Sequence, residues 1–246
     1  MGVVFFMGSN YEQFFARGLK PRLSSFVVGN FNYRTLSRDK RLLSAIAASV
    51  AAQKFKHLKG FIKWSLAEGI GTDAIYEILL QGHLFCGYPA AIESLFVFRD
   101  IIAIDKKKRP AGRKVSEYRW DVDLFQDRGQ KTASIVYGKN LDLVLNNIKN
   151  LSPELAAGMI YEGYGRIISR RGLDLVTREL AIVAQLTIAG MSRQLFSHLR
   201  GAANAGASKK QIEAVICQSR LFASAAKITK ALIVLEKSLG SDAFQR

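Results

Sequence analysis

Apolar residues recur along most of the chain at the three- and four-residue spacing of helices, and Pro and Gly are scarce inside these stretches. Leu, Ala, Ile, Lys, Arg and Gln, which favour helices, fill the apolar segments. The pattern predicts an all-α protein. The expected helices span residues 22–32, 38–52, 54–68, 73–84, 89–102, 128–138, 140–150, 153–169, 175–189, 191–205, 209–220 and 223–239.

Capping residues mark two of these helix starts. Ser152 precedes Pro153, so a hydroxyl can accept an orphan amide hydrogen while proline at the first helical position has none to lose. Ser208 and Gln211 have the spacing of a capping box, and Gly206 is placed to end the helix before them. These signals predict separate helices on both sides of Gly206.

An internal repeat appears when the chain is compared with itself at an offset of 137 residues. Residues 40–95 then align with residues 177–232 without a gap, and 11 of the 56 positions are identical. The matches include Arg41 with Arg178, Gly69 with Gly206, Gln81 with Gln218, and Leu84-Phe85 with Leu221-Phe222. We interpret the chain as two copies of one helical unit, residues 1–103 and residues 127–246.

The segment between the copies, residues 104–126, has the composition of a linker. It contains Pro110 and Gly112 and the basic run Lys106-Lys107-Lys108-Arg109, which is expected to be solvated. Tyr118 and Trp120 are expected to anchor this segment on the surface of the protein.

Charge narrows the choice of partners without identifying one. The 246 residues contain 36 Lys and Arg against 20 Asp and Glu, a net charge of +16, which favours anionic partners such as a small anionic substrate. The excess is distributed over the whole chain instead of being concentrated in a tail. The charge distribution therefore does not favour nucleic acid as a partner.

Hydropathy and cysteine content bear on the compartment. The longest stretch without Asp, Glu, Lys or Arg is residues 78–92, which is shorter than a membrane-spanning helix needs. Residues 1–15 lack the basic segment that begins a secretory signal. Cys86 and Cys217 lie in apolar segments without metal-ligand spacing, as buried thiols of a cytoplasmic protein would. We therefore expect a cytoplasmic protein that does not cross a membrane.

Glu179 and His198 are the residues most suited to acid–base chemistry. They lie on two consecutive predicted helices, and a carboxylate and an imidazole on packed helices can share a proton. Contact does not follow from the spacing, because their distances from the turn at Gly190 differ. His198 as a structural core histidine, and Glu179 as a surface carboxylate favoured by the helix dipole, remain open alternatives.

Two stretches of the chain resemble the carboxymuconolactone decarboxylase family, which includes alkylhydroperoxidase D-like proteins. They are Tyr164 to Leu180, which contains Arg178-Glu179, and His198-Leu-Arg-Gly-Ala-Ala-Asn204-Ala-Gly206. The resemblance implies the all-helical fold of that family. It makes residues 127–246 similar to a whole single-copy member and residues 1–103 similar to a diverged copy. Because single-copy relatives form hexameric rings, it also implies a homotrimer equivalent to a hexamer.

The residues at the family's active positions differ from the peroxidase pattern. Glu179 and His198 match that branch, but Met191 and Gln194 stand where its two cysteines would be. Thiol peroxidase chemistry needs a thiolate nucleophile and a resolving thiol, and neither Met nor Gln can supply one.

The first copy departs further from the pattern. Leu42 replaces the glutamate, Phe61 replaces the histidine, and Lys54 and His57 occupy the cysteine positions. This copy is expected to be structural, although His57 or Lys54 could line a shared site.

The branch that remains resembles 4-carboxymuconolactone decarboxylase, which needs no cofactor because its lactone carbonyl accepts the electrons left by carbon dioxide. By this resemblance His198 donates the proton, and Glu179 orients His198 or returns a proton to it. Candidate binding residues are Arg178, Arg193 and Arg200 as carboxylate clamps and Tyr164 as a hydroxyl in the pocket. These arginines could equally belong to the general basic excess.

Three other functions stay open. An alkylhydroperoxidase-related antioxidant protein would need Cys86 or Cys217 to be exposed and reactive. A non-catalytic oligomeric scaffold would not depend on His198. A nucleic-acid binder would lose affinity steeply as salt increases.

Overall fold

The computed structural model describes residues 35–103 and 120–240, and within these ranges the secondary structure is helical, without strands. The prediction of an all-α protein is confirmed. The helices are α3 (Arg38–Ala51), α4 (Phe55–Ala67), α5 (Thr72–Ile102), α6 (Val122–Tyr137), α7 (Leu141–Lys149), α8 (Pro153–Gly158), the π-helix η5 (Met159–Ile168), α9 (Leu175–Ala189), α10 (Ser192–Asn204), α11 (Lys209–Gln218) and α12 (Ala225–Ser238), with short 3₁₀ turns η4 (Gly138–Asn140) and η6 (Ser219–Leu221).

The predicted capping signals are confirmed. The Ser152 hydroxyl accepts a hydrogen bond from the Leu155 amide, and Pro153 is the first residue of α8. Ser208 and Gln211 form both hydrogen bonds of a capping box at the start of α11. Gly206, after the end of α10, has φ 109°, a conformation that favours glycine.

Three expectations about the elements were wrong or lie outside the described residues. The helices expected at 73–84 and 89–102 are one element, α5, with a kink where Gly87 has φ 82°. Helix α6 begins at Val122 instead of residue 128, because Asp121 caps it and accepts a hydrogen bond from the Leu124 amide. The helix expected at 22–32 and most of the expected linker, including Tyr118, lie outside the described residues.

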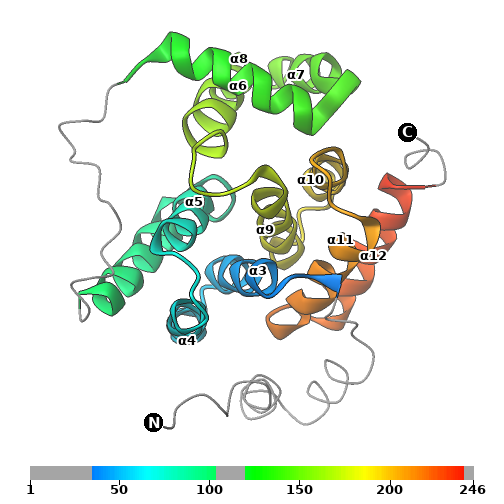
Figure 1. Ribbon diagram of the computed structural model, residues 1–246. Helices are drawn as coiled ribbons and strands as arrows, with labels where there is room; N and C mark the ends of the chain where they lie inside the picture. Colours follow the sequence, from blue (N-terminus) through cyan, green and yellow to red (C-terminus); the bar gives the residue numbers. More distant parts are fainter. Residues whose placement is uncertain (1–34, 104–119, 241–246) are drawn as a thin grey trace, which may run out of the picture.

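The core is divided between two clusters that meet where α3 packs against α9. One cluster is built from α3, α4 and α5, and the other from the helices between α6 and α12. Ala48 of α3 lies in the second cluster, and Ala181 of α9 lies in the first. Figure 1 shows α3 and α9 at the centre of the molecule, with the remaining helices arranged around them.

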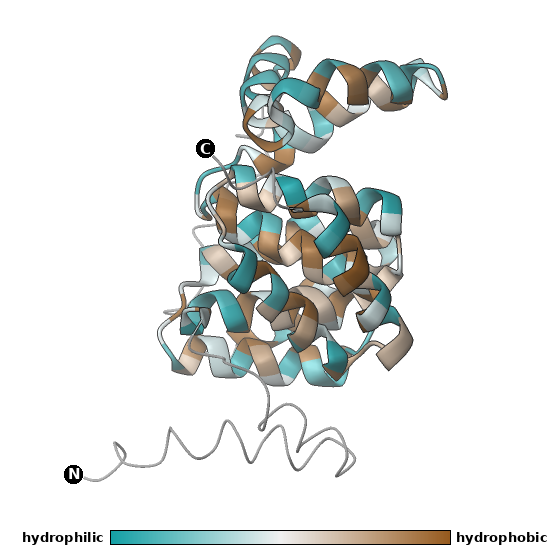
Figure 2. Cartoon of the chain, turned by 90° about the vertical axis from the view of Figure 1, so that its right-hand side faces the viewer, coloured by the Kyte–Doolittle hydropathy of each residue, from teal (hydrophilic) through white to brown (hydrophobic). Residues whose placement is uncertain are grey.

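Helices α6, α7 and α8 form a layer at one end of the molecule, and Figure 2 shows this layer projecting beyond the main body. Helix α6 packs against η5 with almost no space between the backbones. A Cβ atom added at Gly129 would lie 2.0 Å from the Ile160 carbonyl oxygen, and one at Gly165 would lie 1.9 Å from the Phe125 carbonyl oxygen. The two glycines therefore set how closely α6 approaches η5.

Two hydrogen bonds cross between the halves of the chain at positions that the sequence repeat pairs. The Gln81 side-chain amide donates to the Arg178 carbonyl oxygen at 3.2 Å. The Gln218 side-chain amide donates to the Arg41 carbonyl oxygen at 2.7 Å. Residues that align in the repeat thus make the same contact with their roles exchanged.

No helix among the described residues is long and apolar enough to cross a membrane.

Candidate acid–base site

Glu179 and His198 are in direct contact. Oε2 of Glu179 on α9 lies 2.9 Å from Nδ1 of His198 on α10. The Glu179 side chain is fully buried, and His198 is 6% exposed. A carboxylate at Nδ1 fixes the orientation of the imidazole and leaves Nε2 for a reacting molecule. The structure thus places together the two residues that the sequence could only assign to neighbouring helices.

Local backbone features bring the pair together. The Asp174 side chain accepts a hydrogen bond from the Thr177 amide and starts α9. Gly190 adopts the left-handed conformation, with φ 77°, and ends α9 so that α10 can return alongside it. Gly201, one turn after His198, leaves the space that the carboxylate needs. A Cβ atom there would lie 2.8 Å from Glu179 Oε2 and 2.6 Å from Val136 Cγ1.

The second oxygen of Glu179 has no hydrogen-bond partner among the described residues. Oε1 is buried, and no donor of residues 35–103 or 120–240 contacts it. A buried polar atom without a partner raises the energy of the folded state, and such atoms in native proteins call for an explanation in terms of function or an unseen ligand. Glu179 Oε1 is therefore one of the buried polar atoms whose hydrogen-bonding capacity the described residues leave unfilled.

Two tyrosines lie close to Glu179. The Tyr164 hydroxyl donates to the Tyr137 hydroxyl at 3.0 Å, and the two rings are edge to face. Burial raises the pKa of Tyr137 to about 12, with a smaller contribution from the Glu179 charge. Burial, then the neighbouring Tyr137 and the Glu179 charge, raise the pKa of Tyr164 well above its ordinary value. Both phenols therefore keep their protons at neutral pH.

Tyr164 was a candidate pocket hydroxyl in the sequence, and its ring is 2% exposed. Its hydroxyl reaches Tyr137, a residue that the sequence did not single out. Asn204 of α10 fixes the end of α6 beside this tyrosine, because its side-chain amide donates to the Val136 carbonyl oxygen at 2.9 Å. Tyr137 lies between the two aligned segments of the repeat, residues 40–95 and 177–232. Neither spacing nor the repeat could therefore have indicated it.

Phe85 of α5 completes the described surroundings of the imidazole. Its ring centroid lies 5.3 Å from that of His198, at an interplanar angle of 87°. The sequence contained a signal for this residue, since Phe85 aligns with Phe222 in the repeat, but that match indicated a duplication and not a site.

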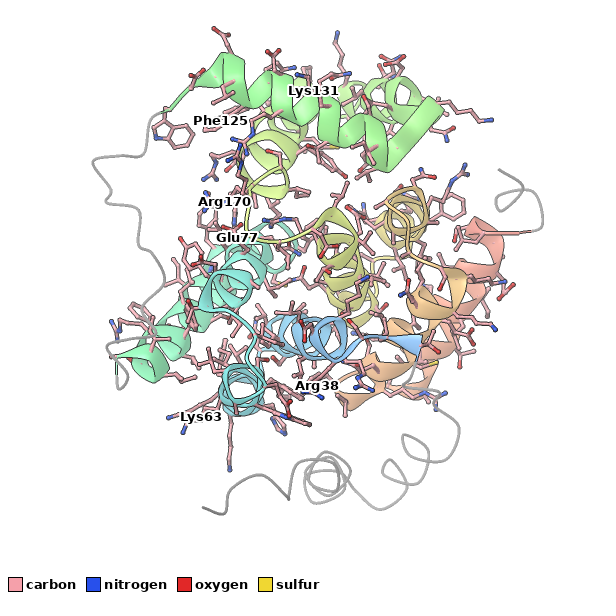
Figure 3. All side chains as sticks on the ribbon, viewed as in Figure 1. Arg38, Lys63, Glu77, Phe125, Lys131 and Arg170 are labelled. Atoms are coloured by element: carbon pink, nitrogen blue, oxygen red, sulfur yellow. The ribbon has the colours of Figure 1, made fainter. Side chains whose placement is uncertain are left out.

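Arg178 was expected from the sequence to bind the substrate carboxylate, but its side chain is engaged elsewhere. Its guanidinium is fully buried and donates to Glu77 Oε2 at 2.8 Å, to Gln81 Oε1 at 3.2 Å and to the Arg170 carbonyl oxygen. Arg170 also pairs with Glu77, and Figure 3 shows Glu77 and Arg170 facing one another. Burial lowers the pKa of Arg178, opposed by the hydrogen bond and charge of Glu77. Arg178 therefore joins α9 to α5.

Arg193 and Arg200 are not brought onto the side of α10 that carries His198. At about 100° per residue they lie about 140° and about 160° around the helix from that residue. Arg193 is exposed and Arg200 is half-buried. The expected clamp of three arginines is thus not assembled at the Glu179–His198 pair.

Cys86 and Cys217 are free thiols and half-buried. Burial raises the pKa of the Cys86 thiol to about 12, and burial followed by the Glu213 charge raises that of Cys217. Met191, which precedes α10, and Gln194 on α10 are both exposed. Among the described residues, no group of three or more His, Cys, Asp or Glu side chains is arranged to hold a metal ion.

The fold and this site define a helical protein with a buried glutamate–histidine pair. The sequence model of the carboxymuconolactone decarboxylase family matches residues 153–237, which include both residues of the pair. The chain is 33% identical over 178 residues to "Peroxisomal protein 2" of Schizosaccharomyces pombe, covering 70% of this chain and 79% of that protein. It is also 32% identical over 91 residues to an "Uncharacterized 15.0 kDa protein in nqo9-nqo10 intergenic region" of Paracoccus denitrificans, covering 36% of this chain and 68% of that protein. The chain belongs to the carboxymuconolactone decarboxylase family.

Proposed function

We propose that the protein is an acid–base enzyme that needs no cofactor, with Glu179 and His198 as its catalytic pair. The leading reaction is decarboxylation of a small carboxylated lactone. The observation that carries the proposal is the 2.9 Å contact between the buried Glu179 carboxylate and Nδ1 of His198, which leaves Nε2 to exchange a proton with a substrate.

In this reaction the bond between the substrate and its carboxylate breaks, and carbon dioxide leaves. The electron pair moves into the lactone carbonyl to give a dienolate. Protonated His198 then donates the Nε2 proton to carbon, and Glu179 stabilises the charged imidazole before the transfer. His198 regains its proton from solvent, so the net reaction consumes one proton and releases one carbon dioxide.

The acid–base step is better supported than a clamp for the substrate carboxylate. Arg178 is engaged by Glu77, and Arg193 and Arg200 lie on other sides of α10. The net charge of +16 still attracts an anionic substrate over a distance. The two protonated phenols that feel the Glu179 charge are our candidates for hydroxyl groups that stabilise charge at the site.

The test is carbon dioxide release from 4-carboxymuconolactone by the purified protein. We expect turnover by the wild type and a loss of at least about 100-fold in His198→Asn, since positioned acid–base groups contribute factors of this size. Lys63→Ala is the control, because this exposed side chain points away from the body on α4. Turnover that is equal in all three proteins, or absent from the wild type, would contradict the proposal.

The alternative of a peroxidase-related antioxidant protein is less well supported. Met191 and Gln194 provide no thiol beside His198, and the pKa of Cys86 is raised to about 12 by burial. An oligomeric scaffold without catalysis does not account for a buried, half-partnered carboxylate against an imidazole. The nucleic-acid binder rests on net charge alone.

We further propose that the chain is two copies of one unit, residues 1–103 and 127–246, joined by 104–126, and that three chains assemble into a homotrimer. The exchanged hydrogen bonds of Gln81 and Gln218 support the two-copy part. Light scattering after size exclusion should give the mass of three 27.3 kDa chains. The mass of one chain would contradict the trimer and leave the two-copy proposal in place.

The cytoplasmic location remains a proposal as well. The printed name of the Schizosaccharomyces pombe relative makes the peroxisome the second candidate. Fractionation of the source cells, with the protein followed by antibody, would separate the two compartments.

A further inference from the structure

Phe85 belongs to the N-terminal half of the chain, yet it contacts the imidazole of the C-terminal half. Its ring lies edge to face with the His198 ring, with 5.3 Å between the centroids. Phe85 is half-buried and His198 is 6% exposed. The phenyl ring is therefore one of the groups that cover the His198 imidazole.

The position of Phe85 is fixed from both sides along α5. One turn earlier, Gln81 donates to the Arg178 carbonyl oxygen, and one turn before that, Glu77 pairs with the Arg178 guanidinium. Two residues later, Gly87 has φ 82° and ends the straight first part of the helix. This part of α5 lies beside α9, which carries Glu179 (Figure 1).

A related aromatic contact occurs a second time in the molecule, at aligned positions that lack the acid–base pair. The ring of Phe222 lies edge to face with that of Phe61, at 6.3 Å and 83°. Phe222 there also lies edge to face with His57, at 5.6 Å and 82°. Phe222 aligns with Phe85 in the sequence repeat, and Phe61 aligns with His198. Leu42, which aligns with Glu179, is 1% exposed. Phe222 is thus a matched comparison for Phe85.

We propose that Phe85 is a specificity-determining residue of the Glu179–His198 site, and that its ring limits the size of the group that reaches Nε2 of His198. This inference rests on the acid–base function proposed above. An aromatic wall beside the proton donor favours an apolar, planar group at the reacting carbon and disfavours a carboxylate next to the ring.

The test uses two acyl esters that differ in size, 4-nitrophenyl acetate and 4-nitrophenyl hexanoate. Nε2 of His198 attacks the ester carbonyl, the bond to 4-nitrophenolate breaks, and water hydrolyses the acyl-imidazole. The yellow phenolate reports the rate, and the rate in His198→Asn is subtracted as background. We expect the wild type to prefer the acetate.

Phe85→Ala should raise the ratio of the hexanoate rate to the acetate rate about 10-fold, the lower end of what a change in pocket size produces. Phe85→Leu, which keeps an apolar side chain against the C-terminal core cluster, should raise it less. Phe222→Ala should leave it unchanged. The melting temperatures of the variants show whether each is folded before its rates are compared.

An unchanged ratio in both Phe85 variants overturns the proposal, as does an equal rise in Phe222→Ala. Absence of any His198-dependent reaction with either ester overturns it too. A ratio that shifts in a protein that releases no carbon dioxide from 4-carboxymuconolactone leaves the specificity role standing and removes the lactone reaction. Carbon dioxide release that depends on His198, together with an unchanged ratio, leaves the lactone reaction standing and removes the specificity role of Phe85.

Discussion

Gly201 determines whether Glu179 and His198 can meet, because the carboxylate occupies the space that a side chain at position 201 would fill. The residue lies among the last four residues of α10, where alanine would favour the helix by up to about 1 kcal/mol. Its presence there is therefore explained by the close approach of Glu179 and Val136 and not by helix propensity. Among single residues, it is the clearest test of the geometry.

We predict that Gly201→Ala lowers activity at least about 10-fold while the helix remains formed. The added methyl would lie 2.8 Å from Glu179 Oε2 and 2.6 Å from Val136 Cγ1, so the carboxylate must move away from His198. Steady-state rates and circular dichroism measure the two effects. Gly163→Ala, where an added Cβ meets nothing within 4 Å, is the control. Full activity in Gly201→Ala would show that the pair tolerates displacement.

The reactivity of the Cys86 thiol is predicted to depend on pH. With its pKa raised to about 12, about one thiol in 10,000 is ionised at pH 8, and the thiolate fraction rises tenfold per pH unit until the pKa is reached. Iodoacetamide should therefore label Cys86 at least about 100-fold more slowly in the native protein than in urea at pH 8. Peptide mass spectrometry measures the rates, and equal rates would revive the peroxidase alternative.

At the scale of elements, most helices of the described residues follow from apolar spacing and capping residues. Ser152-Pro153 and Ser208 with Gln211 are local signals that act through the nearest backbone amides. The start of α6 was missed because Asp121, its cap, follows a charged segment of linker composition. The kink at Gly87 and the π-helix η5 depend on packing, which a single sequence does not display.

The crossing of α6 and η5 yields a prediction of stability. Gly165→Ala should lower the free energy of unfolding by about 3 kcal/mol or more, the upper range of overpacking, because its Cβ would meet the Phe125 backbone at 1.9 Å. Gly163→Ala, on the same π-helix, should change it by less than about 1 kcal/mol. Urea unfolding measures both. Similar stability of the two variants would show that the crossing is not tight.

The contact between α5 and α9 yields a second prediction of stability. Glu77→Ala should destabilise the protein by about 3–5 kcal/mol, because Arg178 would be left buried without its carboxylate. Lys209→Ala is the surface comparison, because both side chains of the Lys209–Glu236 pair are exposed and such pairs contribute about 0–1 kcal/mol. Urea unfolding measures both variants, and a loss in Glu77→Ala no larger than that in Lys209→Ala would contradict the buried role.

At the scale of the whole molecule, the site combines contributions that the sequence could indicate with others that it could not. Glu179 and His198 follow from the family resemblance, but their contact depends on how α9 and α10 pack. Tyr137 and Phe85 reach the site from α6 and α5, far away in the sequence. The expectation that Arg178 binds the substrate carboxylate was wrong. A sequence does not distinguish an arginine that binds substrate from one that pairs with a buried carboxylate such as Glu77.

The central claim is that Glu179 and His198 act as one unit, and a double-mutant measurement of turnover tests it most directly. Carbon dioxide release from 4-carboxymuconolactone is measured for the wild type, Glu179→Gln, His198→Asn and the double variant. Residues that act together lose function together, so the double variant should lose no more than about what the worse single variant loses. A double loss equal to the product of the two single losses, or a Glu179→Gln variant with wild-type turnover, would contradict the account.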